Sequence, residues 1–273
     1  MFVRVSALVA LLGGLVGALP ALNQPATVDA RADRDLAFSV DAECDLDVVT
    51  NLASRHPTVR QFVVMATTDF QSDTGTVEVA VKARDGTWHC VRGPQPAEFG
   101  RNGTRPLTDR RSGDGTTPAG VFPLGVVTAW DGQVFSMFGN RPDPGVQVAY
   151  RAVRNEDCWG ATANTARYQH LVNRPACPGP DDEWLRSYGE AYAHAAVIGA
   201  NIDPISGDEP GEPPYAAAIF LHRTSYATTG IGKPTSGCVS LGYQELVDTL
   251  RSIDPDLDPH FAIGPRDWLI STS

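Results

Sequence analysis

The apolar run from Ala216 to Leu221 is the feature that most limits how this chain folds. The run is short and is bounded by proline and glycine signals, which is typical of a buried strand that delivers His222 to its end. Cys238 follows sixteen residues after His222, and Gly237 and Cys238 lie at a turn where small residues let the backbone approach another group closely. We therefore expect the fold to be arranged around this strand and this turn.

The residue types in this segment suit catalysis by a thiol. Such catalysis requires a nucleophile, a base that takes its proton, and backbone N–H groups aimed at the oxyanion. Cys238 is the candidate nucleophile, His222 the candidate base, and the N–H groups of Gly237 and Cys238 the candidate oxyanion donors. The competing interpretation is a buried structural thiol beside a core histidine. A strand-end histidine taken alone favours that interpretation, and its pairing with Cys238 favours catalysis.

Two segments resemble the catalytic domain of the L,D-transpeptidase (YkuD) family. His222, the intervening loop and Thr235-Ser236-Gly237-Cys238-Val239 are similar to the family motif, a His followed after about this interval by Ser/Thr-His-Gly-Cys and an apolar residue. Upstream, the segment from Gly113 to Leu124 looks like the family's Thr-Pro-x-Gly-x-Phe segment. The resemblance extends over roughly residues 60 to 265.

Two positions depart from the family pattern. Ser236 stands where most members carry His, and Ser240 stands where many carry Arg or Asn. The resemblance is therefore to a divergent branch. Arg223 follows the candidate base directly and is a candidate for binding a substrate carboxylate in place of that missing Arg, with a solvent-facing charge as the alternative. Ser236 and Ser240 complete the set of candidate substrate-binding residues.

The resemblance implies a function as well as a fold. It implies a transpeptidase in which a Cys238 thioester forms on peptidoglycan stem peptides, D-alanine is released and an amine completes a cross-link. Hydrolysis of the same thioester would instead make an L,D-carboxypeptidase. A wall-binding module with a degenerate site is the non-catalytic alternative, motivated by Ser236 and Ser240. No metal or organic cofactor is implied, and the other five histidines show no metal-ligand spacing.

Other cysteine enzymes fit the chain order less well. Peptidases and amidases of the papain and NlpC types place the cysteine before the histidine, whereas here His222 precedes Cys238. Sortase-like transpeptidases have the same order, but their separation is usually much larger and their motif differs. The L,D-transpeptidase interpretation is therefore preferred.

The N-terminus predicts export. Residues 1–21 contain Arg4, an apolar core from Ala7 to Val16 and small residues before a cleavage point, which together indicate a secretory signal peptide. A transmembrane anchor is the alternative, but the apolar run is shorter than the ~20 residues that cross a bilayer. Residues 22–40 are polar and aperiodic, as in a linker, and residues 41–273 form the expected catalytic domain. A secreted or cell-wall-associated protein follows.

The net charge of the chain argues against two classes of partner. The chain has 22 basic and 32 acidic residues and a net charge of −10, and removing the signal segment with Arg4 leaves −11. This balance argues against nucleic acid or anionic lipid as the main partner. Elsewhere in the sequence no apolar run approaches the length of a membrane span.

The five cysteines are an odd number for an exported chain. Oxidising compartments pair structural thiols, so one cysteine is left over, and Cys238 is the natural one to remain free. Cys158 and Cys177 flank an irregular segment, and Cys44 would then pair with Cys90, although four cysteines allow three connectivities.

The pattern of the remaining chain predicts a mainly β domain, a sandwich or barrel with one or two packed helices. Strands are expected at 61–67, 75–82, 87–91 and 120–128, with the first three antiparallel, and at 196–198 and 216–221. Helical spacing is present after Leu46, in the segment from Asp182 to Tyr192, and after a Gly242 N-cap. Phe261, Ile263 and Leu269 indicate a closing strand or docked tail.

Overall fold

The computed structural model describes residues 43–163, 165, 167–177, 179–202 and 215–271. The predicted signal peptide and linker, and most of an acidic loop at 201–214, lie outside the described residues. The helices are α1 (Leu46–Arg55), η1 (Leu107–Asp109), η2 (Arg174–Ala176), η3 (Leu185–Tyr188), α2 (Tyr243–Ser252), η4 (Pro255–Leu257) and α3 (Arg266–Ser271), the η elements being single 3₁₀ turns. The strands are β1 (Gln61–Thr67), β2 (Thr74–Lys82), β3 (Trp88–Glu98), β4 (Thr104–Pro106), β5 (Thr117–Pro123), β6 (Val127–Thr128), β7 (Val134–Phe135), β8 (Met137–Gly139), β9 (Tyr150–Ala152), β10 (Asp157–Trp159), β11 (Leu171–Asn173), β12 (Glu183–Trp184), β13 (Ala195–Val197), β14 (Phe220–Arg223), β15 (Val239–Leu241) and β16 (Pro259–Pro265).

One mixed sheet of eleven strands dominates the domain, in the order β4-β5-β16-β1-β2-β3-β15-β14-β13-β8-β9. Strands make up 37% and helices 18% of the structure, so the prediction of a mainly β fold with packed helices is confirmed. The sheet places β14 and β15 side by side near its middle, with β3 on the other side of β15. The strand that carries His222 and the turn that carries Cys238 are therefore neighbours.

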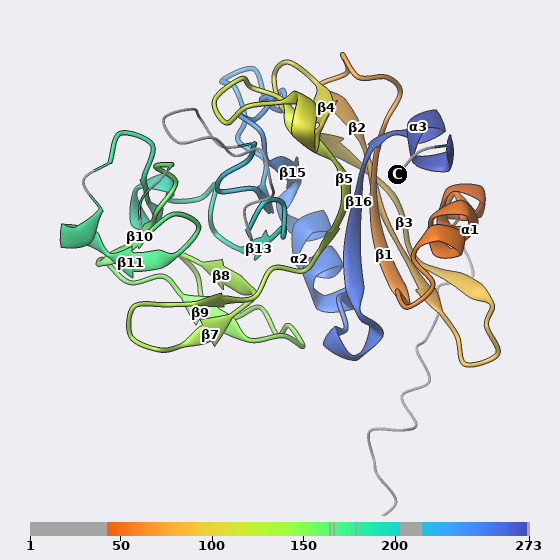
Figure 1. Ribbon diagram of the computed structural model, residues 1–273, viewed down its shortest axis with the longest axis horizontal. Coiled ribbons are helices and arrows are strands. Elements are labelled where there is room, and N and C mark those ends of the chain that lie inside the picture. The colour runs from red at the N-terminus through yellow and green to blue at the C-terminus, as the bar shows by residue number, and fades with distance from the viewer. Residues whose placement is uncertain (1–42, 164, 166, 178, 203–214, 272–273) are drawn as a thin grey trace, which may run out of the picture. The chain divides into compact units, whose positions relative to one another are not determined.

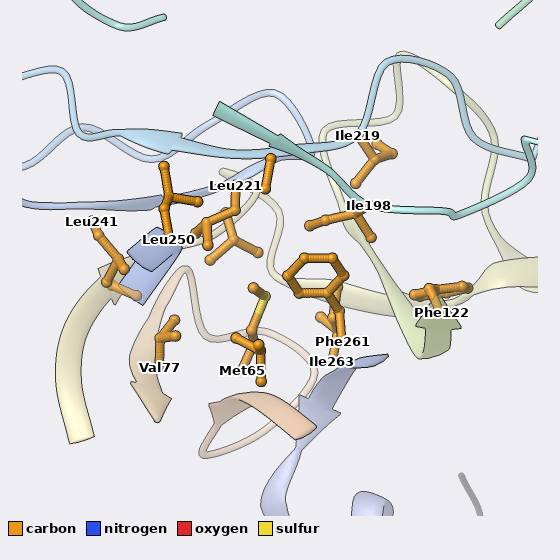
Figure 2. Close-up of a cluster of buried hydrophobic side chains, with 14 of the residues drawn as sticks. Met65, Val77, Phe122, Ile198, Ile219, Leu221, Leu241, Leu250, Phe261 and Ile263 are labelled. Atoms are coloured by element: carbon orange, nitrogen blue, oxygen red, sulfur yellow. The ribbon is translucent and has the colours of Figure 1, made fainter. Parts of the chain in front are cut away.

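The main core lies on one face of this sheet. Side chains from β1, β2, β5 and β16 meet side chains from β14, β15 and α2, and Figure 2 shows Met65, Phe261 and Ile263 facing Leu221 and Ile198. The two halves also join at one margin, where Gly125 donates to the Val197 carbonyl and Gly199 donates to the Pro123 carbonyl. The sheet therefore curls around one apolar interior, because strands that converge from both halves bury the same cluster.

Two helices cover the opposite face of β1. Val63 and Met65 of β1 point into the main core, whereas Phe62 and Val64 pack with α1 and α3 in a second cluster. A strand buried on both faces reads as a continuous apolar run instead of an alternating one, which explains the sequence Phe62-Val63-Val64-Met65. Figure 1 shows α1 and α3 together on this side of β1 and β16.

A third cluster lies between the sheet and the small sheet β11-β10-β12. Phe220 of β14 lies at its centre, with edge-on ring contacts to Phe138, Trp159 and Tyr192 at centroid distances of 5.0, 4.9 and 5.6 Å. Edge-to-face aromatic pairs of this kind favour one fixed ring orientation. The β14 strand is thereby held from both sides, by the main core and by this aromatic cluster.

Most of the expected elements are confirmed. The structure bears out the helix after Leu46, the three antiparallel strands β1–β3, the α2 helix with Gly242 as N-cap, and a closing strand followed by a docked helix. The strand expected at 216–221 is displaced and runs from Phe220 to Arg223. Of the run predicted at 120–128, β5 begins earlier and β6 is separate.

The helix predicted from Asp182 to Tyr192 is wrong. The segment forms the short strand β12 and a single 3₁₀ turn, and β12 pairs antiparallel with β10. Of its aromatic residues, Tyr192 is 3% exposed and belongs to the aromatic cluster, whereas Tyr188 is 40% exposed. The segment forms a strand and a turn despite the helical spacing of its apolar side chains, because pairing with β10 outweighs a weak local helix propensity.

Disulfides join Cys44 to Cys90 and Cys158 to Cys177, and Cys238 is the free cysteine. Of the three connectivities that four cysteines allow, the predicted one is confirmed. The first bond ties the residue before α1 to β3, and the second closes the irregular segment between β10 and η2. Two disulfides fit an oxidising compartment.

Glu78 offers a test of this packing. Its carboxyl group, 4% exposed on β2, accepts a hydrogen bond from the Asp45 N–H at 3.0 Å, and burial raises its pKa from 4.5 to about 7. Between those values the folded protein keeps a proton that the unfolded chain loses, so stability falls as pH rises through this window, by about 3 kcal/mol in all. Glu78→Gln keeps the acceptor oxygen, and we expect it to remove this part of the pH dependence in urea unfolding between pH 4.5 and 7.5. Parallel pH profiles of the variant and the wild type would contradict the assignment.

Candidate active site

The parallel register of β14 and β15 sets the positions of His222 and Cys238. Leu221 pairs with Val239 and His222 pairs with Ser240, so Cys238 lies one step before the strand pairing begins. Leu221 and Val239 point into the main core, whereas Phe220 and Cys238 border the aromatic cluster. Because side chains alternate along a strand, His222 and Cys238 emerge on the same side of two adjacent strands.

The upstream Thr-Pro segment packs directly against the cysteine turn. The Thr117 hydroxyl donates to the Cys238 carbonyl oxygen at 3.1 Å and accepts a hydrogen bond from the Gly100 N–H at 2.8 Å. A backbone bridge between Gly100 and Thr235 fixes the other side of the turn. The two segments that carry the family resemblance, more than a hundred residues apart, therefore form one continuous structure.

Gly237 has a backbone conformation that favours glycine. Its φ is +149°, and an added Cβ atom would meet the Thr116 carbonyl oxygen at 3.1 Å. The Gly237 N–H donates to the Thr235 hydroxyl at 3.1 Å, and this hydroxyl donates to the Cys238 carbonyl oxygen at 2.6 Å. An oxyanion would have to compete with Thr235 for the Gly237 N–H, one of the two donors expected from the sequence.

His222 is held in one tautomer. Its Nδ1 lies 2.8 Å from the Arg223 carbonyl oxygen, and because a carbonyl oxygen only accepts, Nδ1 carries the proton of the neutral ring. The unprotonated Nε2 is then the basic nitrogen. Burial lowers the pKa of His222 to about 4, although the carbonyls of Arg223 and Ala191 oppose this shift. The imidazole is therefore neutral at pH 7 and able to accept a proton.

The Cys238 thiol is also neutral at rest. Burial raises its pKa to about 12, with a further increase from Glu183, whereas the Phe220 N–H and the Arg110 guanidinium act in the opposite direction. The sulfur donates to the Ala218 carbonyl oxygen at 3.4 Å, and Cys238 is a partly exposed residue. At rest, the thiol of Cys238 and the imidazole of His222 are therefore both neutral.

The Ala218 carbonyl is itself held in place by a strained backbone. Ala218 has a φ of +53°, and Gln169, at +57°, accepts a hydrogen bond from the Ala218 N–H at 3.1 Å. The same amide side chain donates to the Ala216 and Asn201 carbonyls. Non-glycine residues with positive φ persist where the surroundings over-determine them. Here they fix the carbonyl that holds the thiol hydrogen.

Arg110 lies behind the cysteine turn. Its side chain is 1% exposed, and it donates to the Thr116 carbonyl at 2.8 Å and the Tyr215 carbonyl at 2.5 Å. Its Nη2 would be 3.5 Å from a Cβ atom placed on Gly237. Burial lowers the pKa of Arg110, and Asp114 and Cys238 raise it again. A fixed positive charge next to the nucleophile favours a thiolate. Sequence reasoning missed this residue because its segment reads as an aperiodic loop.

The three candidate substrate-binding residues are placed very differently. Arg223 forms an ion pair with Glu190, which also pairs with Arg141. Ser236 is exposed and accepts a hydrogen bond from Arg101 at 3.3 Å. Ser240 is fully buried, and its hydroxyl accepts from Thr224 at 3.2 Å. Of the three, Ser236 is the one whose side chain lies open to solvent beside the cysteine turn.

Glu183 is a second residue that the sequence did not indicate. Its carboxyl group accepts a hydrogen bond from the Tyr192 hydroxyl at 2.7 Å, and the Tyr192 ring lies edge-on to the His222 ring at a centroid distance of 5.4 Å. Burial raises the pKa of Glu183 to about 7, with Tyr192 and Tyr188 acting in the opposite direction. Its segment carried a helical pattern with no acidic motif, so only the β12–β10 pairing reveals its position.

The neutral thiol predicts an unusual pH dependence of alkylation. Below the thiol pKa, the rate of iodoacetamide labelling follows the thiolate fraction and rises about tenfold per pH unit. With that pKa at about 12, we expect the rate on Cys238 to rise from pH 6 to 10 with no plateau. The denatured, disulfide-intact chain is the control, and its rate should level off above about pH 8.5. A plateau near pH 7 in the folded protein would show a thiolate–imidazolium pair instead.

Among the described residues, no group of three or more histidine, cysteine or acidic side chains is arranged to hold a metal ion. In the same part of the chain, no helix has the length and apolar character needed to cross a membrane. Comparison with known proteins finds no matching family model, no matching curated protein and no matching solved structure.

Proposed function

We propose that this protein is a cysteine-dependent acyltransferase of the L,D-transpeptidase kind that acts on peptidoglycan stem peptides. The observation that carries the proposal is the contact between the Thr116-Thr117 segment and the Gly237-Cys238 turn, on the side of β15 next to His222. Both segments resemble the same family, and the fold brings them together around the free cysteine. This convergence supports one active centre better than two unrelated resemblances.

The proposed first half-reaction uses His222 and Cys238, which lie on the same side of two adjacent strands. The thiol proton moves to Nε2 of His222, and the sulfur attacks the carbonyl carbon of the third residue of a tetrapeptide stem. The C–N bond to the terminal D-alanine then breaks, and His222 returns the proton to the leaving amine. Because Cys238 and His222 are both neutral at rest, we expect the thiol proton to move to His222 only when substrate is bound. Arg110 stabilises the transient thiolate through its fixed charge.

The second half-reaction resolves the thioester. An amine from a second stem forms a cross-link, whereas water completes an L,D-carboxypeptidase reaction. In both cases Nε2 of His222 accepts a proton from the attacking group and passes it to the departing sulfur.

One observation favours the non-catalytic alternative. A thiol whose pKa is raised to about 12 is inert toward most electrophiles in the resting protein. A wall-binding module with the same fold would show such a thiol without ever transferring its proton. The family resemblance and the His222 tautomer, which leaves Nε2 free to accept a proton, support a catalytic protein. The catalytic and the non-catalytic proposals differ in whether D-alanine is released.

The proposed location is extracellular or in the cell wall. Two disulfides and the predicted signal peptide support it. The test of function is incubation of the purified mature protein with tetrapeptide muropeptides, followed by mass spectrometry. Cross-linked dimers with free D-alanine are expected, and tripeptides alone would show the carboxypeptidase. Unchanged muropeptides that still bind to the protein would show the non-catalytic module.

A further inference from the structure

Glu183 is held beside the candidate base by two tyrosines. Its Oε2 accepts the 2.7 Å hydrogen bond from Tyr192, whose ring contacts His222, and Tyr188 stacks on Tyr192 at a centroid distance of 4.5 Å. The pairing of Glu183 with Trp159 fixes its backbone in the small sheet. The carboxyl group is therefore one side chain away from His222, in a defined orientation.

Among the described residues, the carboxyl group of Glu183 has no positively charged partner. None of the ion pairs among the described residues includes it, and its hydrogen-bond partners there are tyrosine hydroxyls. Glu183 is a partly exposed residue, as Cys238 is. A negative charge here raises the pKa of the Cys238 thiol, which opposes formation of the nucleophile. A carboxylate in this position is useful to catalysis when a cationic ligand neutralises it.

We propose that Glu183 binds the cationic amino group of the acyl acceptor, the side-chain ammonium of a diamino acid in a second stem peptide. The inference rests on the proposed function. An ammonium donates to a carboxylate through charge-assisted hydrogen bonds, which are the stronger kind. Glu183 is a partly exposed residue, and its partner Tyr192 contacts the ring of His222, so an ammonium bound to Glu183 would lie close to the candidate base.

The transfer step balances as follows. The ammonium gives one proton to the Glu183 carboxylate, and the neutral amine attacks the thioester carbon. A C–N bond forms and the C–S bond breaks, while a second proton leaves the nitrogen through Nε2 of His222 and reaches the sulfur. Glu183 then releases its proton to water. Water as the attacking group has no positive charge for Glu183 to bind, so Glu183 favours cross-linking over hydrolysis.

The first test compares acceptors in the Glu183→Gln variant. The probes are a tripeptide stem with its side-chain amine free and the same peptide acetylated on that amine. In Glu183→Gln we expect the KM for the free-amine acceptor to rise about 10- to 100-fold, the cost of one charge-assisted hydrogen bond. Single-turnover D-alanine release should persist or become faster, since the thiol pKa falls.

Tyr192→Phe, which leaves the carboxylate in place without its hydroxyl partner, should show a smaller rise in the KM for the free-amine acceptor. The exposed Glu156→Gln is the matched control and should leave the KM unchanged.

An unchanged KM for the amine acceptor in a folded Glu183→Gln protein would overturn the inference. A wild-type protein that releases no D-alanine would instead refute the proposed function, and a second test of Glu183 would remain. In that test, the free-amine tripeptide should speed iodoacetamide labelling of Cys238 in the wild type, because the bound ammonium offsets the Glu183 charge. The acetylated peptide should have no effect, and neither peptide should act on Glu183→Gln. Equal labelling rates with and without the free-amine peptide in the wild type would also overturn the inference.

Discussion

Cys238→Ala is expected to release no D-alanine from tetrapeptide stems, and His222→Ala to release it about 10²- to 10⁴-fold more slowly than the wild type. The first variant removes the atom that forms the thioester. The second removes the Nε2 base, which is the only route in this account by which a thiol with a pKa of about 12 loses its proton at pH 7. Release of D-alanine under single-turnover conditions measures both effects without interference from the acceptor.

Ser236→Ala is the matched control for these variants. Its hydroxyl is exposed and accepts a hydrogen bond from Arg101 on the outer side of the turn, so we expect the release rate to stay near that of the wild type. A loss as large as that of Cys238→Ala would give Ser236 a direct role in the reaction. Equal release by His222→Ala and the wild type would show that His222 is not the base.

Arg151→Met is expected to have the largest effect on stability, with a loss of about 3–5 kcal/mol. The guanidinium of Arg151 is fully buried and donates to both carboxylate oxygens of the equally buried Asp157, at 2.7 and 2.8 Å. It also donates to Asp131 at 2.9 Å, which ties β9 and β10 to the turn before β7. Replacement by methionine keeps most of the volume but leaves the Asp157 charge buried without a cation.

Arg266→Met provides the comparison for an exposed ion pair. Arg266 binds Asp45 with its side chain 46% exposed, so the loss should be within about 1 kcal/mol. Urea unfolding at pH 7 measures both variants. Similar losses for Arg151→Met and Arg266→Met would show that the buried network adds no more than a surface pair does.

The opening strands and the last helix followed from the sequence because their signals are local. Val77, Val79 and Val81 recur at every second position along β2, with Glu78 and Lys82 on the alternate positions, and Asp85-Gly86 marks the turn before β3. The stripe of Leu246, Val247 and Leu250 after Gly242 identifies α2 in the same way. Where side-chain period and turn chemistry agree, the element forms as expected.

The segment around Leu185 shows where local signals fail. Its apolar and aromatic spacing fits a helix, but Glu183-Trp184 pairs with β10, and Gly189 ends the 3₁₀ turn with a φ of +51°. The Cys158–Cys177 disulfide and the aromatic cluster organise this region through contacts distant in sequence. No period within eleven residues reports such contacts.

Some residues of the candidate site could likewise be predicted from local sequence patterns, and others could not. His222 and Cys238 could be found from a strand end and a small-residue turn, both of which are local patterns. Arg110 and Glu183 could not, since each reaches the site through a partner in another segment, Thr116 and Tyr215 for Arg110 and Tyr192 for Glu183. Which charged residues become buried near Cys238 depends on the folded chain, and no periodic pattern in the sequence indicates them.

The most direct test of the account is the mass of the intact protein after treatment with a carbapenem. The family resemblance implies that this β-lactam imitates the acyl donor and acylates the nucleophile. We expect one adduct on the wild type, mapping to Cys238, absent from Cys238→Ala and formed about 10²- to 10⁴-fold more slowly in His222→Ala. A wild-type protein that stays unmodified and also releases no D-alanine from tetrapeptide stems would contradict the assignment of Cys238 as a catalytic nucleophile.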